Sequence, residues 1–136
     1  MTPLAPASMP AAPPGPRAAL LSRLAPGDFF HAESPRGASL PCLVLAVTDA
    51  QIRARRVTTQ ETLVYDRRTG REVVGAPDEV VTIITSVAPL PVEIHDTLLW
   101  LDRKNRMARG FDDAALSQRE IKALLFIDEH YALHPL

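Results

Sequence analysis

The sequence predicts an α+β fold: a small antiparallel β-barrel of five or six strands over about residues 28–86, SH3-like in size, followed by a C-terminal antiparallel helical hairpin. Two observations lead to this prediction. Short β-branched runs recur between turn signals about every eight to twelve residues, a spacing typical of small barrels and sandwiches. Beyond Pro91, apolar residues recur instead at the spacing of an amphipathic helix.

The chain of 136 residues has room for one domain. Residues 1–16, MTPLAPASMPAAPPGP, contain six prolines and almost no charge, and this composition predicts a disordered tail. Residues 17–136 are then a single globular domain, with the barrel over 27–87 and the helical hairpin over 91–134.

The strands are predicted from β-rich runs that turn residues separate. These runs are Asp28–Glu33, Pro41–Thr48, Gln51–Thr59, Thr62–Asp66 and Glu79–Thr85. Side chains alternate between the two faces of a strand, so Ile52 and Ala54 are expected to face inward. By the same rule, Arg53 and Arg55 face solvent. The stretch Asp66–Gly70, DRRTG, is a hairpin signal, because the aspartate can accept amide bonds from the turn and the glycine can adopt a positive φ.

Three helices are predicted. Arg17–Leu24 forms one or two turns that the Pro26-Gly27 pair ends. A longer helix starts near Pro91 and ends at Gly110. Its apolar stripe is Ile94, Leu98, Leu101 and Ala108. Trp100 lies beside this stripe, where it can pack against the barrel or lie at a partner surface, and packing is the favoured interpretation.

The last helix is predicted from its first residues. Ser117 and Glu120 have the spacing of a capping box, in which each side chain accepts a hydrogen bond from the other residue's backbone amide. The apolar stripe of this helix is Ile121, Leu124, Ile127 and Tyr131. The short connection between the two helices predicts that they lie antiparallel.

Composition narrows the function classes. The formal net charge is −1, so the total charge does not indicate a nucleic acid or an anionic membrane as partner. The single cysteine, Cys42, cannot form an internal disulfide, and the apolar runs are too short to span a bilayer. We therefore expect a soluble, cytoplasmic protein of bacterial type, with no membrane association and no cofactor.

Five arginines are the candidate binding residues. They are Arg53, Arg55, Arg67, Arg68 and Arg71. Residues 51–71 hold six arginines against Glu61 and Asp66, whereas residues 72–87 hold three acids and no basic residue. We expect the two stretches to lie on neighbouring strands, where opposite charges pair across the sheet. On this interpretation the arginines form a salt-bridged solvent face.

The alternative is a basic ridge that follows the phosphates of a nucleic acid. Nucleic-acid-binding barrels usually add exposed aromatic residues that stack on bases, and Tyr65 is the only aromatic residue in the arginine-rich stretch. It alternates with Leu63 on the side expected to face inward. Arg56 also falls on the inward side by alternation. Either a bulge shifts the register there, or Arg56 reaches a buried acid, with Glu61 and Asp66 as candidates.

The histidines do not form a recognisable site. His130 and His134 are four residues apart, a spacing that places both on one helical face, but no third ligand follows at the spacing of a metal site. His31 alternates within a strand and is expected to be structural. The sequence contains no Gly-rich phosphate loop or serine elbow, and its one pair of adjacent carboxylates that stands out, Asp112-Asp113, is expected to lie in a loop before the capping box.

Three functions remain open. The favoured one is a non-enzymatic binding or accessory module, with a protein partner or self-association rather than nucleic acid. The second is a nucleic-acid-binding barrel that uses the Arg53–Arg71 stretch. The third is an enzyme whose site the sequence does not reveal, or which is complete only in an oligomer.

Overall fold

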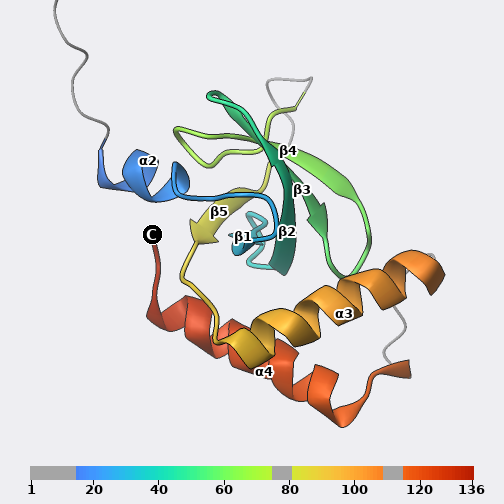
Figure 1. The fold of residues 1–136 in the computed structure, drawn as a ribbon. Coiled ribbons are helices and arrows are strands. Elements are labelled where there is room, and N and C mark those ends of the chain that lie inside the picture. Colours follow the sequence, from blue (N-terminus) through green and yellow to red (C-terminus); the bar gives the residue numbers. More distant parts are fainter. Residues whose placement is uncertain (1–14, 75–80, 109–114) are drawn as a thin grey trace, which may run out of the picture.

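The computed structural model describes residues 15–74, 81–108 and 115–136 (Figure 1). Three predicted features lie partly or wholly outside these residues. They are the tail up to residue 14, the start of the strand predicted from Glu79, and the helix end predicted at Gly110.

The β region is a curled, antiparallel sheet of five strands. These are β1 (Phe29–Glu33), β2 (Ser39–Val47), β3 (Gln51–Arg56), β4 (Thr62–Asp66) and β5 (Ile83–Ser86). Their order is β4-β3-β2-β1-β5. Between the two edge strands, Glu72 forms an isolated bridge with Tyr65 of β4, and Arg71 forms one with Ile83 of β5. The predicted α+β class is confirmed. The strands form a curled sheet, and the predicted closed barrel is not confirmed (Figure 1).

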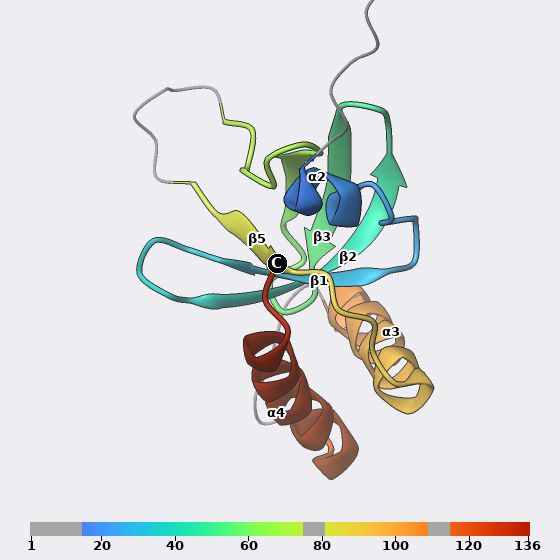
Figure 2. The same cartoon turned by 90° about the vertical axis from the view of Figure 1, so that its left-hand side faces the viewer.

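Both faces of the sheet are covered, so the sheet separates two hydrophobic cores. Phe30 and Cys42 belong to an inner core that also includes Leu21 of the short helix α2 (Pro16–Leu21). Their neighbours Phe29 and Leu43 point the other way, into an outer core with residues of α3 (Val92–Ala108) and α4 (Gln118–Leu133). Figure 2 shows α2 on one side of the strands and the helix pair on the other. This double coverage explains why β2 is a continuous apolar run rather than an alternating one.

Helix α2 (Pro16–Leu21) begins with a proline, whose missing amide hydrogen costs nothing at the first helical position. Pro16 therefore belongs to the folded domain rather than to the tail. Arg17 joins the helix to the sheet: its Nε donates to the carbonyl of Thr69 at 2.7 Å, and its Nη2 donates to that of Ile84 at 2.6 Å. The helix then buries Leu21 in the inner core.

Helices α3 (Val92–Ala108) and α4 (Gln118–Leu133) run in opposite directions beneath the sheet (Figure 1). The predicted capping box is confirmed, because the Ser117 hydroxyl accepts from the Glu120 amide at 3.1 Å and the Glu120 carboxylate accepts from the Ser117 amide at 2.8 Å. The same carboxylate accepts a hydrogen bond from Lys104 of α3 at 2.8 Å, which links the two helices. In the described part of the chain, none of the helices has the length and apolar character needed to cross a bilayer.

Candidate functional site

Arg55, predicted to face solvent, lies instead between the sheet and α3. Its Nε and Nη2 donate to the two carboxylate oxygens of Asp102 at 3.0 and 2.7 Å. Asp102 is only 2% exposed, and it also accepts from Gln60 Nε2 at 3.0 Å. The hydrogen bonds to Asp102 raise the pKa of the guanidinium, which therefore stays charged. This arginine is thus an interlayer contact and does not contribute to a solvent face.

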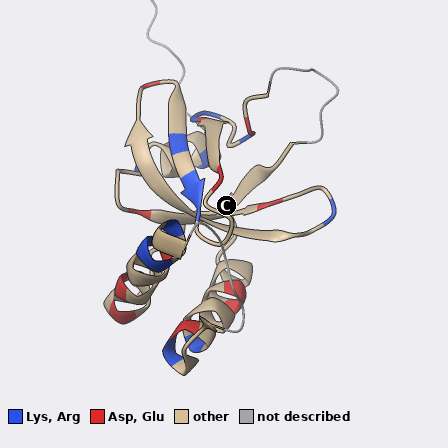
Figure 3. Ribbon diagram, turned by 90° about the vertical axis from the view of Figure 1, so that its right-hand side faces the viewer, with Lys and Arg blue, Asp and Glu red and all other residues tan. Residues whose placement is uncertain are grey.

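Alternation along β3 identifies its two faces correctly, but α3 covers the second face at Arg55, whereas Arg53 on the same face is exposed. Leu43 of β2 pairs with Arg55 across the sheet, and Leu43 belongs to the outer core. Figure 3 shows the basic stretch of β3 meeting the helix layer. The signal that could have revealed this lies in α3. Asp102 is one turn from Leu98 on the apolar stripe, and an acid at such a position needs a cationic partner.

Arg67 is also occupied by structural contacts. Its guanidinium donates to the carbonyls of Thr48, Ser22 and Leu24, at 2.7, 2.9 and 3.1 Å. These three bonds hold the end of α2 against the turn between β2 and β3. The remaining candidates are exposed, and none of them forms an ion pair with an acid of the described residues. They are Arg53, Arg68 and Arg71.

Arg56 reaches one of the two predicted acids, but that acid is not buried. Its Nη1 lies 2.9 Å from Oε2 of Glu61, whose side chain is 55% exposed. Arg56 pairs across the sheet with Cys42, so it does lie toward the inner core, with its head group turned back along the β3–β4 hairpin. The prediction of a buried acid partner was therefore wrong for Arg56, and Arg55 fills that role.

A pocket of about 470 Å³ between the sheet and α4 contains a chain of polar groups. His31 Nε2 lies 2.8 Å from the Ser39 hydroxyl, which donates to the Asp128 carboxylate at 3.0 Å. His31 Nδ1 lies 2.7 Å from the Thr85 hydroxyl. Burial lowers the pKa of His31, although the carboxylates of Glu33 and Asp128 act in the opposite direction.

These contacts set the direction of the hydrogen bonds. A carboxylate only accepts, so the single hydroxyl proton of Ser39 goes to Asp128. His31 must then donate from Nε2 to Ser39. The Thr85 hydroxyl lies 2.7 Å from His31 Nδ1 and 3.3 Å from the His31 carbonyl, to which it donates. A nucleophilic serine needs the reverse arrangement, in which the imidazole accepts its proton. The network therefore ties the sheet to α4, as a structural histidine would.

His130 and His134 are near each other, with ring centroids 4.9 Å apart. His130 Nε2 lies 2.8 Å from the carbonyl of Pro89, and its ring stacks on Phe126. A nitrogen that donates to a carbonyl cannot ligate a metal at the same time. Within the described ranges, no group of three potential ligands gathers at these histidines or elsewhere.

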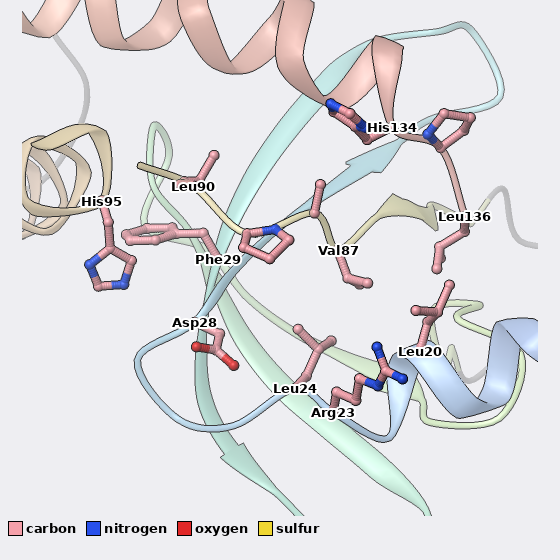
Figure 4. A pocket seen from close by; sticks show the side chains of 13 residues that line it. Leu20, Arg23, Leu24, Asp28, Phe29, Val87, Leu90, His95, His134 and Leu136 are labelled. Atoms are coloured by element: carbon pink, nitrogen blue, oxygen red, sulfur yellow. The ribbon is translucent and has the colours of Figure 1, made fainter. Parts of the chain in front are cut away.

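A groove of about 440 Å³ opens between α2, the start of β1 and the C-terminal residues (Figure 4). Its wall is mainly apolar and includes Leu20, Leu24 and Phe29. Polar groups stand at its edge. They are Arg23, Asp28, His95 and His134. His95 contacts Phe29 edge to face and has Nε2 2.8 Å from the carbonyl of Gly27, so it is held in place by the fold.

Most of the large apolar side chains that are exposed to solvent in the described residues lie on the helix pair. Of the ten large hydrophobic side chains that are exposed in the described residues, eight belong to α3 and α4. They are Val92, Leu99, Trp100 and Met107 on α3, and Ile121, Leu125, Phe126 and Leu133 on α4. Trp100 is 58% exposed, so the prediction that it packs against the sheet was wrong. We call these eight residues the outer helical face.

Comparisons with known proteins do not assign a family. No family model matches the chain, and neither a curated protein nor a solved structure shows significant similarity to it.

Proposed function

We propose that the protein is a non-enzymatic interaction module that binds protein through the outer helical face. The single observation that carries the proposal is the concentration of exposed apolar side chains on α3 and α4. Isolated exposed hydrophobic residues are common on protein surfaces, but their concentration on one pair of elements is typical of interaction sites.

The residue types support a protein partner. Trp100 and Met107 are 58% and 76% exposed, and tryptophan and methionine are enriched at protein interfaces. Leu125 on α4 is 65% exposed. Each of these residues lies on the side of its helix away from the buried stripe, where a partner could reach it without disturbing the outer core.

The alternatives have less support. A nucleic-acid ridge would need the five candidate arginines on one open surface, but Arg55 and Arg67 are held by contacts within the fold. Tyr65 is buried and cannot stack on a base. An enzyme would need a nucleophile or a base with a free proton route, and the hydroxyl of Ser39, beside His31, already donates to a carboxylate.

The proposal is tested by partner binding with matched surface variants. A protein that the full chain captures from a lysate is identified, purified and titrated against the chain. We expect Trp100→Glu and Leu125→Glu each to weaken binding at least about tenfold, the effect of losing one interface anchor. Val73→Glu is the control, because Val73 is 46% exposed but lies outside the helices. Binding that survives both helix variants, or that only the control weakens, overturns the proposal.

A further inference from the structure

We infer that α3 pairs with the α3 of a second copy of this chain, antiparallel and across a two-fold axis. This inference rests on the proposed function and names the partner of one part of the outer helical face. It comes from the order of the exposed residues along α3. When the helix is reversed, each acidic position coincides with a basic one and each apolar position with an apolar one.

The exposed residues of α3 form pairs that are centred on one point. Leu99 and Trp100 stand on either side of this point. Moving outward, Asp96 corresponds to Arg103 and Glu93 corresponds to Arg106. At the outer positions Val92 corresponds to Met107. All eight side chains are exposed.

A two-fold axis through the centre of a helix brings each such pair together twice, because residue i of one copy meets residue j of the other and the reverse. Asp96 and Glu93 of one copy then face Arg103 and Arg106 of the second copy. Apolar residues meet at the centre and at both ends. The result is a helix contact with apolar anchors and opposite charges between them.

The same charges exclude the parallel arrangement. In a parallel pair each residue would meet its own type, so Asp96 would face Asp96 and Arg103 would face Arg103. Like charges in contact oppose association, which makes the order of charges a determinant of direction. The charges are also available for a partner. Glu93, Arg103 and Arg106 form no ion pair with an acid or base of the described residues, and Asp96 lies 3.8 Å from the adjacent His95 only.

The length of the helix is sufficient for such a contact. Seventeen residues extend over about 25 Å at the rise of an α-helix. Leu99 and Trp100, at the centre, are the positions where water is best excluded and where binding energy concentrates. The exposed ion pairs contribute mainly to specificity and to the rate of association.

The first test is the mass of the full chain in solution across a concentration series, measured by sedimentation equilibrium. We expect a monomer–dimer equilibrium that Trp100→Glu shifts to monomer. Val73→Glu is the matched control, since it adds the same charge at an exposed apolar residue outside the helices and should leave the dimer intact. A wild-type chain that is monomeric at every concentration overturns the inference, and so does a dimer that Trp100→Glu leaves unchanged.

A charge exchange tests the direction of the helices. Asp96→Arg alone places two like charges opposite each other and should weaken the dimer. The double variant Asp96→Arg with Arg103→Asp restores opposite charges and should dimerise again, yet it should not mix with wild-type chains, because like charges then meet. Free mixing of the two, or no recovery in the double variant, overturns the antiparallel pairing.

Failure of this inference differs in its readout from failure of the proposed function. A monomeric chain that still binds a purified partner through Trp100 and Leu125 retains the interaction module and rejects only the second copy as occupant of α3. Circular dichroism and melting temperature of each variant confirm that the fold is unchanged.

Discussion

Asp102 on α3 and Arg55 on β3 are joined by two hydrogen bonds, of 3.0 and 2.7 Å, across the interface between the sheet and the helix layer. The carboxylate is almost completely buried and the arginine side chain is 15% exposed. This contact fixes the position of the long helix on the sheet.

Removing one partner of this pair should be costly. Arg55→Ala leaves Asp102 charged and buried without its partner, so we expect a loss of about 3–5 kcal/mol in the free energy of unfolding. Arg53→Ala, two residues away on the same face of β3 but at an exposed position, should change it by no more than about 0.5 kcal/mol. Urea denaturation measures both. A loss in Arg55→Ala that is no larger than in Arg53→Ala would contradict the role of the pair.

Arg56 should be the milder neighbour. Its ion pair with Glu61 is on the surface, and exposed pairs contribute about 0–1 kcal/mol. We therefore expect Arg56→Ala to lose less than Arg55→Ala in the same urea experiment. Glu61→Gln is the control that removes only the charge. If Arg56→Ala proves the most destabilising of the three arginine variants, the buried part of its side chain carries more than the ion pair does.

His31 should make the protein less stable in mild acid. Burial lowers its pKa in the fold, whereas the unfolded chain takes up its proton near the ordinary pKa of 6.5. Between the two values the unfolded state binds more protons, so the free energy of unfolding falls as the pH drops below about 6.5. Urea denaturation at pH 7 and pH 5 measures this slope. His31→Gln should reduce it, and an unchanged slope would mean that other groups cause the acid sensitivity.

The capping box predicts a modest effect at the start of α4. Ser117→Ala removes the acceptor of the Glu120 amide and should cost about 0.5–2 kcal/mol. Ser117→Asp keeps an acceptor at this position and is the matched control. Equal stability of the alanine variant and the wild type in urea would show that the cap does not contribute.

The exposed arginines should not hold a nucleic acid. Arg53, Arg68 and Arg71 remain exposed, but Arg55 and Arg67 between them are held by the fold, and Tyr65 is buried and cannot stack on a base. We expect no change in the fluorescence anisotropy of a labelled single- or double-stranded oligonucleotide at physiological salt. Binding in the micromolar range that Arg53→Ala abolishes, and that weakens steeply with salt, would support the nucleic-acid alternative.

The sequence predicted the local features of the fold better than its layers. Alternation identified the two faces of β3, and the spacing of Ser117 and Glu120 located the start of α4, because both signals come from residues close together in the chain. Alternation could not say whether the second face of β3 was covered. That depended on where α3 packs, which is a contact between residues 47 positions apart.

The candidate site was harder to predict for the same reason. The sequence of an arginine-rich stretch does not show what each side chain contacts. In the structure Arg53 is exposed to water, Arg67 donates to backbone carbonyls and Arg55 pairs with a buried acid. Trp100 was assigned to packing from its residue type. Its position one turn from Asp96 and Arg103 is polar, and this was the local sign that it lies on an exposed side.

Cys42 lies in the inner core at the middle of the sheet, fully buried, and burial raises the pKa of its thiol to about 12. It is the only cysteine in the chain. Alkylating reagents attack the thiolate, so this residue reacts only when the strands separate. The rate at which a thiol reagent modifies Cys42 under native conditions therefore measures how often the sheet opens. Cys42 is a natural probe for this measurement, so no label has to be introduced.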